Sequence, residues 1–447
     1  MGGLPEKPGV TLCWGLLVWA AYVLSQTPSV RGQVMARAVS PAEIDRRCDA
    51  AKEQVIAWRR DLHEYPELSN REVRTAGVVA EHLRGLGIEV RTEVAHTGVV
   101  GVLKGGRPGP VVALRADMDA LPVTEAVDLP FASKVKTVYN GREVGVMHAC
   151  GHDVHTAVLM GVAQVLSQMR DELAGTVKFI FQPAEEGAPS GEEGGARLMI
   201  REGALDNPKP DVIFGLHVSP KYHVGAIAYR SGAAMAASDG LRIVVHGRQA
   251  HGASPWGGTD PIVVASQIVL GLQTIISRQV DLPEAPAIIT VGSIHGGVRS
   301  NIIPDEVELV GTVRTFVPEM RSDIHERIRA TATLIAQSAG ASADVAIYPG
   351  YPVTFNDPNL TEQMIPVLEA TVGKSSVVSS PPVTGAEDFS YYQQQVPGLY
   401  FFLGVTPAGA DPKTAATCHS PHFYADEGAL AVGVRCLAHL TVAYMQK

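Results

Sequence analysis

The chain has 447 residues, of which 46% are hydrophobic and 19% are charged. A chain of this length and composition can bury more than one core, so two domains are expected. Acidic residues outnumber basic ones by 46 to 37, and no basic run alternates with aromatic side chains. These features argue against nucleic acid as a partner.

The N-terminal segment has the order of a secretory signal. Lys7 precedes an apolar run from about Val10 to Leu24, and small and polar residues follow as far as Ala38. This order predicts a signal peptide over residues 1–38 and a secreted or periplasmic protein. An uncleaved anchor is the alternative, but the run is short for a membrane span. We expect no later stretch to be long and apolar enough to cross a membrane.

Helix and strand patterns alternate over residues 43–235. Apolar residues recur at helical spacing from Ile44 to His63, and Ser69 with Glu72 predicts the capping box of a second helix. The later elements expected here are strands at 99–103 and 111–114, a helix at 155–173, and strands at 177–181 and 211–218. Strands that alternate with helices favour a largely parallel sheet, so this segment is expected to begin an α/β domain.

A second pattern begins after the small residues between Ser231 and Asp239. Its elements are a strand at 241–245, a helix at 260–278, strands at 287–294 and 306–315, a helix at 320–338 and a strand at 343–347. This βαββαβ order predicts a ferredoxin-like domain, inserted over residues 236–348. A buried strand at 399–404 and a helix at 427–444 follow, so residues 349–447 are expected to complete the first domain.

Thiol and imidazole side chains are concentrated at residues 147–155, whose sequence is MHACGHDVH. A Cys-x-His pair such as Cys150 and His152 is a weak signal by itself, because it more often reflects packing. Further metal-capable residues stand where expected strands end: Glu185 and Glu186 follow one strand, and His217 ends another. The carboxyl ends of parallel strands meet at one edge of a sheet, where α/β domains bind ligands.

A loop near the C-terminus adds the sequence CHSPH at residues 418–422, which includes His419. A thiolate, imidazoles and a carboxylate suit two divalent cations, most simply zinc, with manganese or cobalt as alternatives. The adjacent carboxylates of Glu185 and Glu186 suit metal binding by one and proton transfer by the other. These residues predict a metallohydrolase. Asp117 and Asp119 end another strand, where a solvated turn is the alternative reading.

The chain resembles the aminoacylase and carboxypeptidase family of co-catalytic metallopeptidases, in particular its branch of hippurate hydrolases and plant indole-acetyl-amino-acid hydrolases. The resemblance extends from about Val55 to Leu440. It rests on these motifs in order: RADMDALP, MHACGHDVH, QPAEEG, GLHV, AHGASPWGGTD, SNIIPDE, GAEDF and CHSPHF. It implies a zinc-peptidase-like catalytic domain, and an inserted lid domain through which the protein forms a homodimer or a higher homo-oligomer.

The resemblance also implies roles for individual residues. The implied metal ligands are Cys150, which bridges two metals, together with His152, Glu186, His217 and His419. Glu185 is implied as the general base. In the lid, His251 is implied to stabilise the oxyanion, and Asn301 and Arg314 to hold the substrate carboxylate. Asp119 is interpreted as a residue that orients a ligand imidazole, and the role of Asp117 is left open.

The expected activity is metal-dependent hydrolysis of the amide bond of N-acyl or N-aroyl amino acids. This reaction gives a carboxylic acid and a free amino acid. One alternative is a dipeptidase or carboxypeptidase with the same machinery, and another is a catalytically silent binding protein with the same fold. Cys48, Cys418 and Cys436 show no spacing of a disulfide framework, so we expect them to be free or to form at most one bridge.

Overall fold

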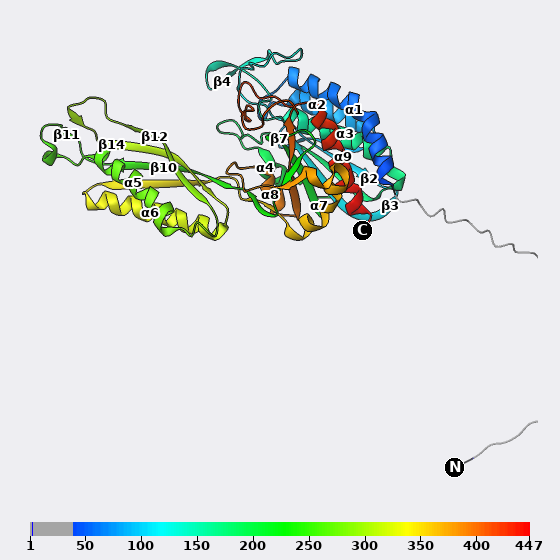
Figure 1. Ribbon diagram of the computed structural model, residues 1–447. Helices are drawn as coiled ribbons and strands as arrows, with labels where there is room; N and C mark the ends of the chain where they lie inside the picture. The colour runs from blue at the N-terminus through cyan, green and yellow to red at the C-terminus, as the bar shows by residue number, and fades with distance from the viewer. Residues whose placement is uncertain (1, 3–38) are drawn as a thin grey trace, which may run out of the picture. The chain divides into compact units, whose positions relative to one another are not determined.

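The computed structural model describes Gly2 and residues 39–447, so the expected signal segment lies outside the described residues. Within these residues, an eight-stranded sheet and a four-stranded sheet carry the main helices (Figure 1). The strands of the smaller sheet all lie between Ala237 and Pro349, and the larger sheet is built from the chain on either side.

The large sheet has the strand order β1-β2-β6-β3-β7-β18-β8-β17. In that order the strands are Glu89–Val94, Gly98–Lys104, Ala174–Gln182, Arg107–Asp117, Val212–His223, Gly398–Thr406, Ile227–Tyr229 and Val377–Ser379. The pairs β6–β3, β3–β7, β7–β18 and β8–β17 are parallel, and the pairs β1–β2, β2–β6 and β18–β8 are antiparallel. The largely parallel sheet expected from the sequence is therefore confirmed.

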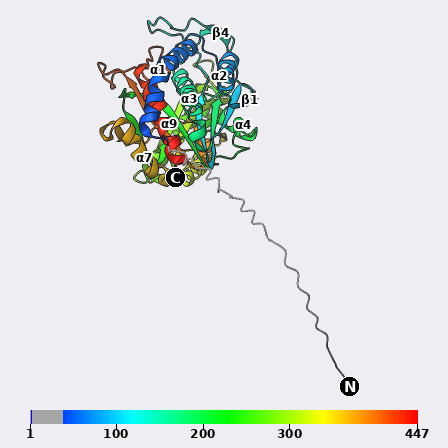
Figure 2. The ribbon, with the colours of Figure 1, turned by 90° about the vertical axis from the view of Figure 1, so that its right-hand side faces the viewer.

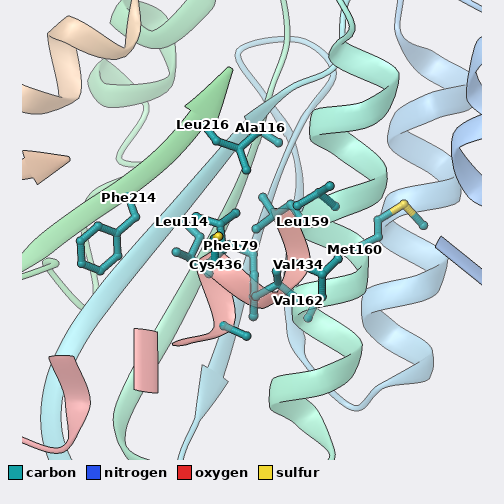
Figure 3. Close-up of a cluster of buried hydrophobic side chains, with 14 of the residues drawn as sticks. Leu114, Ala116, Leu159, Met160, Val162, Phe179, Phe214, Leu216, Val434 and Cys436 are labelled. Carbon is teal, nitrogen blue, oxygen red and sulfur yellow. The ribbon is translucent and has the colours of Figure 1, made fainter. Parts of the chain in front are cut away.

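Helices cover both faces of this sheet. On one face, α1 (Pro41–Glu64), α3 (His152–Ser167) and α9 (Gly428–Met445) pack against one another (Figure 2). They share a core with alternate strand residues such as Val112 and Leu114, part of which Figure 3 shows. The intervening Ala113 faces a second core, which includes residues of α4 (Gly195–Arg201) and α8 (Phe389–Gln393). This alternation is the period of two expected for a strand buried on both sides.

The close approach of α1 and α3 requires a glycine. A Cβ atom at Gly161 in α3 would lie 2.6 Å from Cγ2 of Val55 in α1. The side chains of α3 are buried almost all round, which explains why its sequence is apolar on every face. Helices α2 (Val73–Gly85) and α7 (Pro358–Val372) complete this layer.

The small sheet has the order β12-β14-β10-β15, with every neighbouring pair antiparallel. In that order the strands are Ala287–Gly296, Glu306–Thr315, Ala237–His246 and Ser342–Pro349. Helices α5 (Pro261–Gln279) and α6 (Pro318–Ser338) pack on it through their own core (Figure 1). This is the ferredoxin-like arrangement predicted from the βαββαβ order. We call this unit the lid.

Some local expectations are wrong. Ser69 and Glu72 do not form a capping box, because neither side chain caps α2. The sequence pattern does not predict the strand at Glu89–Val94. Helix α3 starts at His152, three residues before the expected start at His155. These errors share a cause, since long-range contacts compete with the local pattern.

Two described helices, α5 and α9, are long and apolar enough to cross a membrane by length and composition. Our expectation that no later stretch has this composition is therefore wrong. Most of the apolar window of α9 is buried in the core beside α1 and α3, and α5 buries Ile268 and Leu272 in the core of the lid. The core helices of soluble proteins meet the same criterion, so length and composition alone carry little weight here.

Candidate metal centre

The segment from Cys150 to His152 makes a tight turn into α3. Gly151 has a φ of +84°, and a Cβ atom at this position would lie 2.5 Å from Cγ2 of Val218. Only glycine fits both the left-handed backbone and this close approach. The turn places the thiol of Cys150 and the first residue of the helix, His152, beside the edge of the sheet.

The five expected ligands lie together, and we call them the ligand cluster. Sγ of Cys150 is 3.4 Å from Nε2 of His217, and Nε2 of His419 is 3.0 Å from Oε1 of Glu186. Ligand atoms within 4.8 Å of one another form the groups Cys150–His152–His217, Cys150–Glu186–His419 and His152–Glu185–Glu186. Cys150 and His152 each belong to two of these groups, so the groups adjoin one another.

The donor atoms fit a metal better than they fit one another. Nε2 of His152 is buried and has no hydrogen-bond partner in the described residues, although its Nδ1 is engaged. A buried ring nitrogen without a partner is costly unless something else binds it. A thiolate, imidazoles and a carboxylate are ligands for borderline cations such as zinc.

Asp119 contacts both the His152 ring and the backbone of the Glu185–Glu186 pair. Nδ1 of His152 lies 2.9 Å from the backbone oxygen of Asp119 and 3.2 Å from its Oδ1. The same carboxylate accepts hydrogen bonds from the backbone amides of Glu185 and Glu186, each at 3.1 Å. The hydroxyl of Ser69 donates to Oδ2 of Asp119 at 2.7 Å, the same oxygen that accepts the amide of Glu186. This geometry fits the interpretation of Asp119 as an orienting residue.

Asp117 is held by other side chains. Its carboxylate lies 2.6 Å from Nη1 of Arg115 and 2.6 Å from Nδ1 of His155. The backbone amide of Val218 donates to Nε2 of that imidazole. Burial opposes the protonation of His152, but the negative charges of Asp117 and Asp119 raise the pKa of its ring well above the usual range. Asp117 thus contributes charge behind the cluster.

The carboxylate of Glu185 is buried among like charges. Ligand atoms of Glu185, Glu387 and Asp388 lie within 4.8 Å of one another. Burial raises the pKa of Glu185 well above its usual range, and the charges of Glu387 and Glu186 raise it further. Arg115 offsets part of this repulsion, because its Nη2 lies 3.0 Å from Glu387 and 2.8 Å from Asp388. A carboxyl group in such a setting is suited to exchange protons.

Several residues around the cluster were missed by the sequence reasoning. Glu387 and Asp388 belong to the GAEDF motif, which was noted without a role for either residue. Glu72 was assigned to a helix cap, but its carboxylate accepts the backbone amide of Ala184 at 2.9 Å and the hydroxyl of Thr97 at 2.5 Å. The GAEDF motif was the available signal for Glu387 and Asp388, whereas Glu72 stands in a helix-cap pattern and carries no signal of its bond to Ala184.

A largely apolar cavity of about 400 Å³ adjoins the cluster at His217 and Cys418. Its apolar walls include Tyr222, Met235, Pro382, Val383 and Phe402. Cys48, Cys150, Cys418 and Cys436 are all free thiols, so the described residues contain no disulfide.

The three expected substrate residues lie in the lid and make local contacts. His251, in β11 (Ala250–His251), accepts the backbone amide of Ala253 on its Nδ1 at 3.0 Å, and its side chain is exposed. Asn301 is also exposed, and Arg314 is half-buried. Among residues 39–447, none of these side chains hydrogen-bonds to the ligand cluster. This structure therefore brings the ligands together with Glu185 but not with these three residues.

A ligand cluster at the carboxyl edge of a parallel sheet, beside a buried glutamate, defines a metal-binding hydrolase. The chain belongs to the peptidase family M20/M25/M40, whose family description matches residues 113–443. The enzyme class expected from the sequence is thereby confirmed.

Similar proteins agree with this membership. A thermostable carboxypeptidase of Saccharolobus solfataricus is 43% identical over 88% of this chain and 96% of its own length. An IAA-amino acid hydrolase of Arabidopsis thaliana is 36% identical over 98% of this chain and 95% of its own length. A solved Bacillus subtilis structure, described as a dinuclear metal-binding peptidase of the M20 family, is 37% identical with a TM-score of 0.74, covering 89% of this chain and 99% of that one.

Proposed function

We propose that this enzyme hydrolyses the amide bond of N-acyl or N-aroyl amino acids with the help of two divalent cations, most simply zinc. The observation that carries the proposal is the pairing of Glu185 and Glu186, whose carboxylates reach the same imidazole. Oε2 of Glu185 and Oε1 of Glu186 each lie 4.0 Å from Nε2 of His152. One carboxylate of the pair can hold metal while its neighbour moves a proton.

The residues divide the work as follows. Cys150 would be a ligand in two adjacent groups, and His152, Glu186, His217 and His419 would supply the other metal ligands. Bound cations supply Lewis-acid chemistry, which polarises the amide carbonyl and acidifies water. Glu185 takes the proton of the attacking water and delivers it to the leaving nitrogen.

The cavity beside His217 supports the proposal that the substrate carries an apolar acyl group. Its walls offer aromatic and aliphatic side chains such as Phe402 and Val383, which match a benzoyl, indolyl or alkyl chain better than a charged one. The carboxylate of the amino acid would instead meet Arg314 of the lid. Nη1 of this guanidinium makes its hydrogen bonds to Ser238, Thr312 and the Val313 carbonyl. In the described residues, Nε and Nη2 have no such bond, and together they match a carboxylate.

Peptide hydrolysis is the second candidate. It is favoured by the similarity to a carboxypeptidase, because the same residues can cleave any linear amide whose two ends fit. A silent binding protein is the third candidate. The buried Glu185 next to a full set of ligands argues against it, since a protein that only bound its ligand would not need a proton acceptor at this point.

One experiment separates the three candidates. Purified protein is loaded with zinc, manganese or cobalt, its metal content is measured, and it is assayed on N-acetyl, N-benzoyl, N-indoleacetyl and N-succinyl amino acids beside dipeptides. Efficient turnover of substrates with apolar acyl groups and a content of two metals per chain support the proposal. Faster turnover of dipeptides would favour the peptidase, and no turnover of any substrate by metal-loaded protein would leave the binding protein.

We also propose that the protein is exported and forms a homodimer or a higher homo-oligomer through the lid. The N-terminal order of Lys7, an apolar run and small residues supports export. The protein is expressed with residues 1–38 in place, and the sequence of its mature N-terminus shows whether this segment is cleaved. Analytical ultracentrifugation at several protein concentrations measures the oligomeric state.

A further inference from the structure

Tyr351 links the lid to the backbone of the expected general base. It follows β15, the last strand of the lid sheet, and precedes the short strand β16 (Thr354–Asn356). Its hydroxyl donates to the backbone oxygen of Glu185 at 2.6 Å. The ring is half-buried and packs edge-on against Tyr391, with their ring centroids 6.1 Å apart.

The two chain segments that join the lid to the catalytic domain are bonded to each other at this point. The backbone amide of Ser238 donates to the oxygen of Tyr351 at 3.0 Å, and the amide of Gly350 donates to the oxygen of Ser238 at 2.9 Å. A Cβ atom at Gly350 would lie 2.4 Å from that Ser238 oxygen, so the approach needs a residue without a side chain. We call these two segments, at residues 238–239 and 349–351, the hinge, and the hydrogen bonds between them fix the backbone at Tyr351.

The backbone around Glu185 needs such support. Ala184, just before it, has a φ of +53°, a left-handed conformation that costs energy in a residue with a Cβ atom. Glu72 holds the amide of Ala184, and Asp119 holds the amides of Glu185 and Glu186. These three bonds come from the catalytic domain and restrain amide groups. The bond from Tyr351 restrains the carbonyl and comes from the hinge.

We propose that Tyr351 is a positioning residue that holds the backbone of Glu185 from the hinge of the lid and so fixes the direction of the catalytic carboxylate. The inference rests on the proposed function, because it assigns work to the general base of that reaction. Catalysis requires the carboxylate to lie within hydrogen-bond reach of the water it deprotonates, and small displacements of such a group are costly. A hydroxyl that fixes the carbonyl one bond away from the Cα atom of Glu185 meets this need.

The matched variants are Tyr351→Phe and Tyr391→Phe. Each removes one hydroxyl from neighbouring tyrosines, and the hydroxyl of Tyr391 donates to the Gly350 carbonyl at 3.4 Å, with no hydrogen bond to Glu185 among the described residues. We expect Tyr351→Phe to lower kcat about tenfold, which is the rate equivalent of one hydrogen bond, with KM and metal content unchanged. We expect Tyr391→Phe to keep the wild-type kcat.

Steady-state kinetics on one N-acyl amino acid, with metal content and thermal midpoint measured on the same samples, decide the matter. Wild-type kcat in Tyr351→Phe would overturn the inference while leaving the proposed function intact. An equal fall in both variants, or a fall that follows metal loss, would also overturn it, since the hydroxyl would then act on general structure. A wild type that turns over no substrate overturns the proposed function and this inference with it.

Discussion

The Asp119 carboxylate lies 3.2 Å from Nδ1 of His152 and also accepts the backbone amides of the two glutamates opposite. One side chain thereby sets the orientation of a ligand ring and the position of the Glu185–Glu186 pair. In Asp119→Asn, an NH₂ group would face one of those amides and the charge beside His152 would be lost. We expect metal affinity to fall about 10–100-fold, measured by metal retention during dialysis against buffered zinc.

The control for Asp119 is Ser69→Ala. It removes one hydroxyl donor from the same carboxylate and leaves the charge and its other contacts in place. Its metal affinity should stay within a few-fold of wild type. Wild-type affinity in Asp119→Asn would contradict the orienting role.

Glu185→Gln tests proton transfer. The amide keeps the size and polarity of the side chain but cannot accept the proton of water, so kcat should fall by about 10²–10⁴ while the metal content stays at the wild-type level. Glu193→Gln is the matched control, because Glu193 is an exposed glutamate later in the same segment, paired with Arg201. Near-wild-type turnover in Glu185→Gln would remove its assignment as the base.

Cys150→Ser tests the shared thiolate. A cysteine bound to two cations is deprotonated and shielded, so its replacement should lower both metal content and activity. Cys418→Ser changes a neighbouring thiol that lines the cavity and should keep the metal. Metal-loaded wild-type enzyme should resist alkylation at Cys150, as measured by mass spectrometry of digested peptides. Rapid labelling there would show that the thiol is not a ligand.

The lid residues should separate binding from turnover. His251→Ala should lower kcat with metal content unchanged, because an oxyanion contact acts in the transition state. Arg314→Ala should mainly raise KM, because a guanidinium that holds the substrate carboxylate acts on binding. Initial-rate kinetics on N-acyl amino acids measure both. The reverse pattern, with kcat lost in Arg314→Ala alone, would contradict these roles.

Mixing subunits shows whether His251 serves its own chain or a partner. If His251 reaches the site of a second copy, exchange between a Glu185→Gln subunit and a His251→Ala subunit should restore half of the sites in each mixed dimer. Subunit exchange is followed by native mass spectrometry. Inactivity despite complete exchange would place His251 within its own chain or outside the site.

Asp239 should make the stability of the hinge depend on pH. This buried carboxylate pairs with Arg321 and accepts His325 at 2.7 Å. Burial opposes its charge, but the bonds from His325 and Arg321 lower its pKa to about 2. A depressed carboxyl pKa adds stability above the unfolded value near 4, and that stability is lost as the pH falls towards about 2.

The variant that tests this linkage is Asp239→Asn. It should cost on the order of 1–2 kcal/mol in the free energy of unfolding at pH 7, with the difference from wild type narrowing below about pH 4. Urea unfolding at several pH values measures both. Asp323→Asn, in an exposed pair with Arg327, is the control and should change little. A difference that stays constant down to pH 3 would contradict the linkage.

Both sheets and the ligand cluster follow from local sequence patterns. Apolar periods locate most of the long strands and helices, and Glu185 and Glu186 follow the end of β6, as expected. The expectation that His217 ends a strand is wrong, because β7 continues to His223, and Cys150 lies in the turn before α3. The topology thus brings distant residues to one edge. This convergence predicts a metal site at that edge, whereas the choice of the individual ligands rests on the family resemblance.

The supporting residues could not be read in this way. Ser69 and Glu72 match a helix-cap pattern, yet the bonds that they make lead to Asp119 and Ala184, which are remote in the sequence. Tyr351 carries no local sign of its bond to Glu185, because a lone tyrosine after a strand suits many positions. The exposed positions of His251 and Asn301 likewise depend on tertiary placement, which no local period encodes.

The insertion of the lid also affects the order in which the protein can fold. β18 lies in the sheet between β7 and β8, although both of those strands precede the lid and β18 follows it. During synthesis, β7 is therefore made before its neighbour β18, and the edge of β7 that pairs with β18 stays unpaired until the whole lid has been translated. His419 is made later still, after β18. An exposed strand edge is prone to pair with other chains, so translation arrest within the lid would leave an aggregation-prone product that lacks one expected metal ligand.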